Sequence, residues 1–253
     1  MKKRYGQHFI SDRNILRKIV QFAGIKPTDT VVEIGPGAGG LTRELALACE
    51  KVIAIEIDHD LIAALRSSSP ANVEIVEGDA LQVNFSELTN KSSHVVGNLP
   101  YNVATPLLKK FIENRERFLD ITIMLQREVA ERVCAEPGTR EYGPLSILVQ
   151  YYATPAWGFD VPPGAFKPKP KVDSAVIRLD WKPGVPFLPA FTDFVHRAFT
   201  SRRKKLLNNL LAMLPSLSRD EIVGILNSAG LPADIRAETI SVEQFLRVYN
   251  LTL

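Results

Sequence analysis

Four consecutive residues near the middle of the chain, Asn98, Leu99, Pro100 and Tyr101, suit the recognition of a planar ring that carries an exocyclic amino group. Asn98 offers a side-chain carbonyl that accepts hydrogen bonds. Leu99 precedes a proline, so its backbone is held extended and its carbonyl is expected to point outward. Tyr101 adds a flat aromatic face. Two acceptors beside an aromatic ring would hold both amino hydrogens, whereas the alternative is an ordinary turn between a strand and a helix.

The surroundings of this tetrad favour a binding site. It follows an apolar run at residues 94–97, and Thr105 and Pro106 are expected to start a helix after it as N-cap and first-turn residue. Open α/β sheets bind their ligands at the carboxyl ends of parallel strands. The pattern therefore predicts that the tetrad lies where such a sheet binds a ligand.

A glycine-rich loop at residues 35–40 lies between a predicted strand over 30–34 and a predicted helix. Gly35 and Gly37 have no Cβ, so their backbone can approach a ligand closely. The next predicted strand, 52–58, carries Glu56 near its end, at the offset expected of a carboxylate that binds a ribose. Strand, loop, helix and acid together predict a cofactor that contains a nucleoside, although the loop alone would also fit NAD or FAD.

Asp79 follows a third predicted strand, residues 73–76, and would reach the same crevice. Its carboxylate could accept a hydrogen bond from an adenine amino group, or it could serve only as a turn residue. A fourth strand leads into the tetrad, a fifth is expected over 121–125, and the last over 174–179. We expect an α/β fold with a Rossmann-like sheet.

The overall composition excludes several classes of protein. The 253 residues are 45% apolar and 23% charged, as in an ordinary soluble protein with one large and one small domain, or two domains. The two cysteines and four histidines form no disulfide framework and no metal-ligand pattern. No apolar run reaches membrane-spanning length and the basic start has no apolar core behind it, so we expect a cytoplasmic protein without membrane contact.

Positive charge gathers in two segments, although the net charge is only +3. In the first, Lys167, Lys169 and Lys171 alternate with prolines after Phe166, and in the second Arg202, Arg203, Lys204 and Lys205 begin an amphipathic helical stretch. We expect both to bind a phosphate backbone, the alternative being a solvated face. Capping boxes at Ser218 with Glu221 and at Ser241 with Gln244 predict two further helices. We therefore place an α/β domain at 1–184 and a helical RNA-binding domain at 185–253.

A nucleoside cofactor beside a pocket for a ring amine suggests group transfer to a base. A methyl sulfonium donor fits, because its leaving group is neutral and the reaction needs positioning far more than acid–base help. Acceptors at the Asn98 side chain and the Leu99 carbonyl would favour a pyramidal amine whose lone pair faces the methyl group. Tyr101 would stack on the ring and Phe166 could close its other face. A base within a helix would first have to flip out.

Motifs along nearly the whole chain resemble those of the bacterial ribosomal RNA adenine dimethyltransferases that act near the 3′ end of small-subunit RNA. They are Gly6-Gln7-His8-Phe9-Ile10, Glu33-Ile34-Gly35-Pro36-Gly37, Glu56-Ile57-Asp58, Gly78-Asp79-Ala80, Asn98-Leu99-Pro100-Tyr101, residues 124–129, 162–166, 172–176 and 202–204, Arg236-Ala237-Glu238, and Ile240-Ser241.

This resemblance implies a class I methyltransferase fold, with a seven-stranded sheet and an antiparallel last strand. It implies S-adenosylmethionine as cofactor, contacted at His8, Ile10, Gly35, Glu56, Asp79 and Asn98. The family usually has Asn where this chain has His8, and Leu where it has Ile10. The implied activity is dimethylation of two neighbouring adenosines on small-subunit rRNA in the immature 30S ribosomal subunit, by an enzyme we expect to be a monomer.

Two alternatives remain from the sequence. One is the large-subunit rRNA methyltransferase that confers macrolide resistance, against which the motifs around Arg202 and Arg236 speak. The other is a non-catalytic ribosome-assembly factor, against which the intact tetrad speaks.

Overall fold

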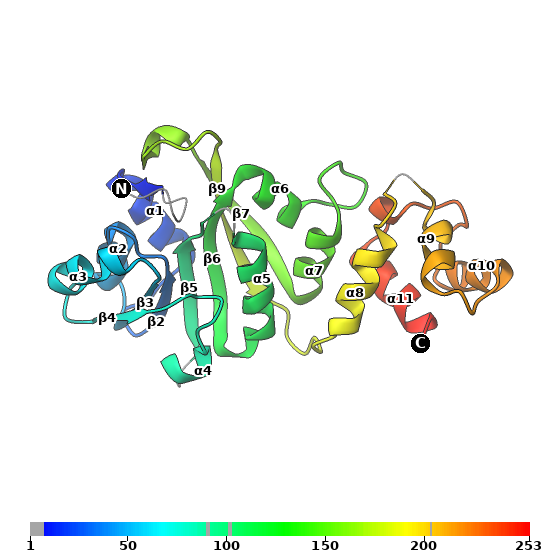
Figure 1. Ribbon diagram of the computed structural model, residues 1–253, viewed down its shortest axis with the longest axis horizontal. Coiled ribbons are helices and arrows are strands. Elements are labelled where there is room, and N and C mark those ends of the chain that lie inside the picture. The colour runs from blue at the N-terminus through cyan, green and yellow to red at the C-terminus, as the bar shows by residue number, and fades with distance from the viewer. Residues whose placement is uncertain (1–7, 90–91, 101–102, 203) are drawn as a thin grey trace. The chain divides into compact units, whose positions relative to one another are not determined.

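The computed structural model describes residues 8–89, 92–100, 103–202 and 204–253, and the chain divides into two units. The first unit comprises Met1–Ala130 and Pro155–Trp181, and the second comprises Glu131–Thr154 and Lys182–Leu253. Figure 1 labels most of the helices and strands of both units. Each unit has its own core and is described by itself.

The first unit is built on a seven-stranded sheet with the order β4-β3-β2-β5-β6-β9-β7. The strands are β2 (Thr30–Ile34), β3 (Lys51–Glu56), β4 (Val73–Glu77), β5 (Ser93–Asn98), β6 (Phe118–Gln126), β7 (Ala153–Val161) and β9 (Ser174–Trp181). The pairs from β4 through β6 are parallel, and β9, the last strand of the chain, runs antiparallel to β6. The predicted Rossmann-like sheet with an antiparallel last strand is confirmed.

The order of the strands reverses between β2 and β5. From β2 the chain adds β3 and β4 on one side, and then returns to pair β5 with the other side of β2. Ligands of open α/β sheets bind at such a reversal, outside the carboxyl ends of the strands. The glycine loop after β2 and Asn98 at the end of β5 both lie there.

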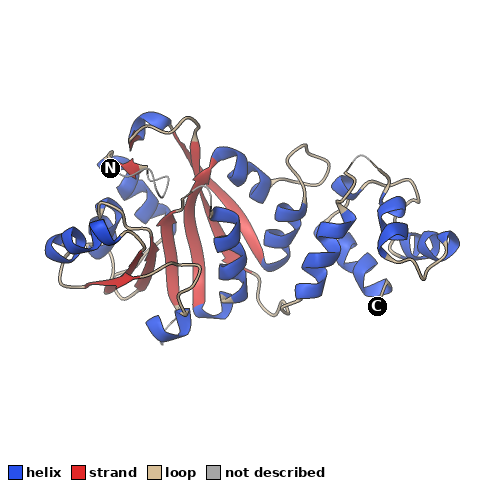
Figure 2. Cartoon of the chain, in the orientation of Figure 1, coloured by secondary structure: helices blue, strands red, loops and turns tan. Residues whose placement is uncertain are grey.

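Helices cover the sheet, as Figure 2 shows. The first-unit helices are α1 (Arg13–Ala23), α2 (Gly40–Ala46), α3 (His59–Ser68), α4 (Phe85–Leu88), α5 (Ala104–Glu113), the 3₁₀ turn η2 (Arg115–Arg117) and the start of α6 (Arg127–Cys134). Apolar residues of α1 and α2 pack with alternate residues of β2 and β3, such as Val31 and Val52. Burial of these side chains from water stabilises the sheet–helix layers.

Two boundaries near the strand reversal differ from the sequence-based expectation. Helix α5 begins after Val103, so Thr105 and Pro106 both lie in its first turn and Thr105 is not the N-cap. A proline fits there because first-turn N–H groups have no intrahelical acceptor. Strand β3 ends at Glu56, because Asp58 caps α3 by accepting a hydrogen bond from the backbone N–H of Asp60.

The N-terminal segment pairs with the lysine- and proline-rich segment. Strands β1 (Phe9–Ile10) and β8 (Phe166–Lys167) form a two-stranded antiparallel sheet. The 3₁₀ turn η3 (Pro163–Ala165) comes directly before β8 in the chain. The N–H of Ser11 donates to the carbonyl of Ala165 over 2.9 Å. The lysine- and proline-rich segment is therefore paired strand, and not free loop, at Phe166 and Lys167.

The second unit is helical. It contains the end of α6, then α7 (Pro144–Tyr152), α8 (Pro189–Ala198), α9 (Leu206–Met213), α10 (Arg219–Ser228), η4 (Ala237–Thr239) and α11 (Val242–Leu251). Both predicted capping boxes are present, at Ser218 with Glu221 and at Ser241 with Gln244. The apolar run at residues 145–152 lies in helix α7.

Residues 131–154 belong to this unit, whereas the sequence-based division at 184 and 185 placed them in the first domain. Hydrogen bonds explain the grouping. The hydroxyl of Tyr142 donates to the carbonyl of Ile240 over 3.0 Å, and the N–H of Gly138 donates to that of Glu238 over 2.7 Å. These long-range bonds cannot be read from local sequence patterns.

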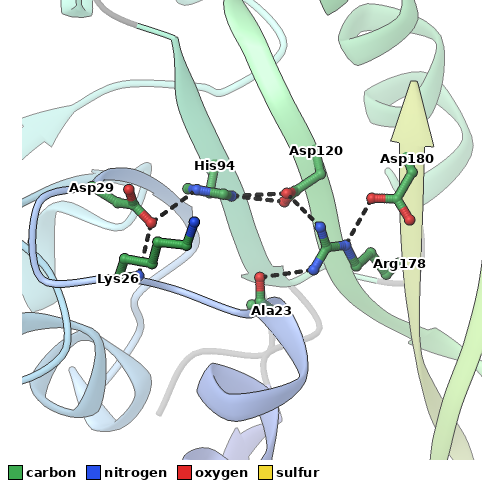
Figure 3. Close-up of polar contacts among 7 residues, drawn as sticks. All are labelled: Ala23, Lys26, Asp29, His94, Asp120, Arg178 and Asp180. Carbon is green, nitrogen blue, oxygen red and sulfur yellow. Dashed lines mark hydrogen bonds and ion pairs between the residues drawn. The ribbon is translucent and has the colours of Figure 1, made fainter. Parts of the chain in front are cut away.

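A buried polar cluster joins the amino ends of β2, β5 and β6 (Figure 3). The glycine loop and Asn98 lie at the other, carboxyl ends of β2 and β5. His94 Nδ1 lies 2.9 Å from the carboxylate of Asp120, and His94 Nε2 lies 3.1 Å from that of Asp29. Arg178 reaches Asp120 from β9 with Nη2 at 2.9 Å. Each buried charge is therefore hydrogen-bonded to an opposite or polar partner.

Among the described residues, no helix is both long enough and apolar enough to cross a membrane.

Candidate functional site

A cavity of about 280 Å³ opens at the strand reversal of the first unit. Its size is close to the lower end of the range of cavities that hold small molecules, roughly 300–1,000 Å³. Its walls come from the N-terminal segment, from the carboxyl ends of β2, β3, β4 and β5, and from helix α5. The lining residues are His8, Phe9, Ile34, Gly35, Gly37, Ile55, Glu56, Ile57, Gly78, Asp79, Ala80, Leu81, Asn98, Leu99, Pro100, Val103 and Leu107.

The glycine loop forms the floor of this cavity without side chains. Gly35 and Gly37 have φ values of +67° and +58°, a left-handed conformation that other residues rarely adopt. A Cβ on Gly37 would lie 2.5 Å from Cε1 of the Phe9 ring. Gly37 is therefore required both by its backbone conformation and by the close approach of Phe9.

Glu56 ends β3 on the cavity wall and is almost fully buried. Its Oε2 accepts from the N–H of Gly37, and its Oε1 accepts from the N–H of Asp58, each over 2.9 Å. Burial raises the pKa of this carboxyl, while the two backbone N–H groups counteract that effect. The carboxylate is thus held in a fixed orientation and ties the glycine loop to β3.

Asp79 follows β4 and also lines the cavity. Its Oδ1 accepts from the N–H of Leu81 over 2.9 Å, and its carbonyl accepts from the N–H groups of Gln82 and Val83. It therefore forms the turn that the sequence offered as the alternative, and at the same time it faces the same cavity as Glu56.

Asn98 is the last residue of β5, and a hydrogen bond orients its side-chain amide. Its Nδ2 donates to the carbonyl of His8 over 2.8 Å, which leaves the acceptor oxygen of the amide as the other end of the group. Leu99 continues the sheet, because its N–H donates to the carbonyl of Met124. Leu99 and Pro100 both line the cavity. Tyr101, the fourth residue of the tetrad, lies outside the described residues.

The N-terminal residues meet the cavity in two different ways. His8 lines it, and His8 Nδ1 lies 2.7 Å from the carbonyl of Pro168. Ile10 packs against the apolar core of the first unit and is not among the lining residues. Phe166, opposite Ile10 in the β1–β8 pair, is only 3% exposed within the same core. The structure therefore brings His8 to the cavity, whereas Ile10 and Phe166 pack in the apolar core and do not line it.

The predicted RNA-binding residues lie in both units. Lys167, Lys169 and Lys171 are exposed in the first unit, and Arg202, Lys204 and Lys205 are exposed in the second. Arg202 has a further role, since its Nη2 donates to the carbonyl of Tyr142 over 3.0 Å and also to that of Arg140. Arg203 lies outside the described residues.

Several cavity residues were not singled out from the sequence, among them Phe9, Ile57 and Leu81. Ile57 had a local signal, because it stands between two acids at the end of a predicted strand, and Phe9 lies in one of the motifs quoted above. Leu81 had no such signal, since only the tertiary fold brings it to this edge of the sheet.

Glu33 lies in β2, two residues before the glycine loop, and is buried without lining the cavity. Complete burial raises the pKa of its carboxyl to about 8, so the side chain is largely protonated at neutral pH. Within the described part of the chain, no group of three or more His, Cys, Asp or Glu is placed to hold a metal ion.

Comparison with known proteins shows the family of the chain. The family described as ribosomal RNA adenine dimethylase matches residues 1–252. Ribosomal RNA small subunit methyltransferase A of Acinetobacter baylyi is 43% identical, over 97% of this chain and 90% of the relative. The protein of the same name from Shouchella clausii is 42% identical, over 98% of this chain and 88% of the relative.

Solved structures with the same fold cover both units. A dimethyladenosine transferase from Plasmodium falciparum superposes with a TM-score of 0.84 at 28% identity, over 97% of this chain and 98% of that one. The 23S rRNA methyltransferase ErmE superposes with a TM-score of 0.75 at 27% identity, over 96% and 99% of the two chains.

Proposed function

The chain belongs to the ribosomal RNA adenine dimethylase family, and from this premise we propose that it dimethylates adenines of small-subunit ribosomal RNA. The methyl donor is S-adenosylmethionine, and the acceptors are the exocyclic N6 atoms of two adjacent adenosines near the 3′ end of that RNA. The product is N6,N6-dimethyladenosine, made during assembly of the 30S subunit. The observation that carries this proposal is the bond from Asn98 Nδ2 to the His8 carbonyl on the wall of the cavity.

The relatives favour the small subunit over the large one. Full-length relatives named for the small subunit are 42–43% identical to this chain, whereas ErmE, named for 23S rRNA, is 27% identical. The cavity speaks against a non-catalytic assembly factor, because a protein that only binds RNA has no need of an oriented acceptor beside a nucleotide-sized cavity.

The residues of the cavity fit the proposed cofactor. Bound S-adenosylmethionine supplies a methyl group on a positively charged sulfur, which leaves as a neutral thioether. Glu56 would hold the ribose hydroxyls, since each of its oxygens accepts one backbone N–H and retains a further lone pair. Asp79 would accept from the adenine amino group, and the glycine loop at Gly35 and Gly37 leaves room for the ligand to lie against the backbone.

Asn98 and Leu99 orient the substrate amine. A lone pair delocalised into the ring makes adenine N6 a poor nucleophile. The Asn98 side-chain oxygen and the Leu99 carbonyl would accept its two hydrogens, which favours a pyramidal nitrogen with its lone pair directed at the methyl group. Because the His8 carbonyl already takes up the Asn98 amide nitrogen, the oxygen is pre-set for this role before the base arrives.

The partner would be the immature 30S subunit, and the exposed lysines of both units would bind part of its phosphate backbone. The enzyme would act in the cytoplasm as a monomer. The target base must leave its stack to reach the cavity.

The decisive experiment is methylation of immature small subunits from cells that lack the modification. Labelled methyl transfer, followed by primer extension, is expected to give stops at two adjacent adenosines near the 3′ end of the small-subunit RNA. Large subunits from the same cells are the matched control. Label in large-subunit RNA would instead support the macrolide-resistance activity, and label in neither would support a non-catalytic factor.

A further inference from the structure

Lys110 lies on the face of helix α5 that borders the cavity, without lining the cavity itself. Val103 and Leu107, which do line it, precede Lys110 by seven and three residues on the same face of the helix. This helix directly follows the segment that carries Asn98. Lys110 therefore belongs to the helix that forms the cavity wall next to Asn98, where the substrate amine would bind.

The ammonium of Lys110 reaches the opposite wall. Its Nζ donates to the backbone carbonyl of Leu81 over 2.6 Å, and the same atom lies 5.4 Å from the centre of the Phe85 ring. Leu81 belongs to the turn after β4, and its own N–H is held by the carboxylate of Asp79. Both Asp79 and Leu81 line the cavity.

Opposing electrostatic effects act on the ammonium group of Lys110. Partial burial lowers the pKa of its ammonium, whereas the negative charges of Asp79 and Glu113 counteract that effect. A charged donor on a backbone carbonyl is among the stronger hydrogen bonds in proteins.

We propose that Lys110 is a positioning residue that fixes the 79–81 turn against helix α5 and so sets the width of the cofactor cavity. The inference rests on the proposed function, because it assigns the cavity to S-adenosylmethionine. In this arrangement the hydrogen bond between Lys110 and Leu81 connects the turn that would hold the adenine to helix α5, which follows Asn98 in the chain.

The test compares three variants. Lys110→Met keeps the apolar stem beside Phe85 and removes the donor. Lys110→Arg keeps a charged donor and is expected to restore function. Lys109→Met is the matched control, since Lys109 is the neighbouring residue and its side chain is exposed. Should Lys110→Met fail to fold, Lys110→Gln replaces it with the same expectations, because its amide is too short to reach Leu81.

Binding of S-adenosylhomocysteine by calorimetry and amide hydrogen exchange of the free protein are the two readouts. We expect Lys110→Met to bind about tenfold more weakly, a difference of about 1.4 kcal/mol. Its KM for S-adenosylmethionine should rise by a similar factor while kcat changes less than threefold. The amides of Leu81, Gln82 and Val83 should exchange faster in that variant alone.

Binding within twofold of the wild type, together with unchanged exchange at these three amides, would overturn the inference. An equal loss in Lys109→Met would do so as well, because the effect would then belong to the charge of the helix and not to the contact with Leu81. A wild-type protein that neither binds S-adenosylhomocysteine nor methylates RNA would overturn the proposed function itself, and the inference with it.

Discussion

The side chain of Asn98 and the backbone of His8 lie 2.8 Å apart, although 90 residues separate them in the sequence. Only the nitrogen of a side-chain amide can donate to a carbonyl, so this bond determines which way the Asn98 amide faces. The residue that directly precedes strand β1 thereby takes part in orienting a residue at the end of β5. Preorganisation of this kind removes a reorganisation cost from the reaction step.

Replacing Asn98 with alanine should abolish most methyl transfer and leave cofactor binding nearly intact. We expect kcat to fall about a hundredfold, a barrier change of about 2.7 kcal/mol, because the amine loses one of its two acceptors. Binding of S-adenosylhomocysteine should change less than threefold, since Glu56 and the glycine loop remain. Turnover within about tenfold of the wild type, near 1.4 kcal/mol, would contradict the mechanism.

Asn98→Asp separates the two roles of the side chain. It keeps an acceptor oxygen but loses the donor to the His8 carbonyl. The loss of kcat should therefore be smaller than in Asn98→Ala, and amide exchange near Phe9 and Ile10 should be faster than in the wild type. Equal losses of kcat in the two variants would mean that the contribution of Asn98 to catalysis comes mainly from the hydrogen bond to His8 and not from its acceptor oxygen.

Gly37→Ala should weaken both cofactor binding and folding. The φ of +58° disfavours any side chain by about 1–2 kcal/mol, and the new Cβ would meet the Phe9 ring at 2.5 Å. We expect a lower melting temperature and weaker binding of S-adenosylhomocysteine. Gly164→Ala is the control, because a Cβ there would have no heavy atom within 4 Å. Wild-type binding in Gly37→Ala would show that Phe9 moves aside freely.

The sequence was sufficient for the sheet, the glycine loop and the edge at which the site lies, because hydrophobic runs, glycines and strand-end acids are local signals. It also predicted both capping boxes, whose partners are three residues apart. It did not predict the bond between Asn98 and His8, the burial of Phe166 against Ile10, or the grouping of residues 131–154 with the second unit. Each of these depends on contacts between residues far apart in the chain, on which local patterns carry no information.

Arg202 should prove important for the stability of the second unit as well as for RNA binding. Its guanidinium donates to the carbonyls of Tyr142 and Arg140, which joins residues 131–154 to the segment before α9. Arg202→Gln is expected to lower the free energy of unfolding by about 1 kcal/mol, as for loss of a typical hydrogen bond. Urea denaturation measures this loss. Lys204→Gln, which removes the same charge from an exposed side chain, should leave stability unchanged.

Lys204 and Lys205 should contribute to RNA binding through charge alone. Each phosphate contact adds about 0.7 to the slope of log affinity against log salt for single-stranded RNA, so the double change to glutamine should reduce that slope by up to about 1.4. Filter binding over a range of salt concentrations measures it. Lys26→Gln with Lys51→Gln is the matched pair, since Lys26 lies in the loop before β2 and Lys51 begins β3, and neither residue lines the cavity. An unchanged slope in the Lys204 and Lys205 variant would mean that this face is only solvated.

His94 should make the stability of the first unit depend on pH. The hydrogen bond to Asp120 raises the pKa of His94, Asp29 and the charge of Asp120 add to that effect, and burial and Arg178 oppose it. Because the folded protein holds the proton more tightly, the stabilisation is complete below the unfolded pKa of about 6.5. It is lost as pH rises through the higher folded pKa. Urea denaturation from pH 6 to 9 should therefore show the free energy of unfolding falling, and His94→Gln should remove that part of the slope. The same slope in His94→Gln as in the wild type would assign the effect to another group, while His196→Gln, at an exposed histidine, should change nothing.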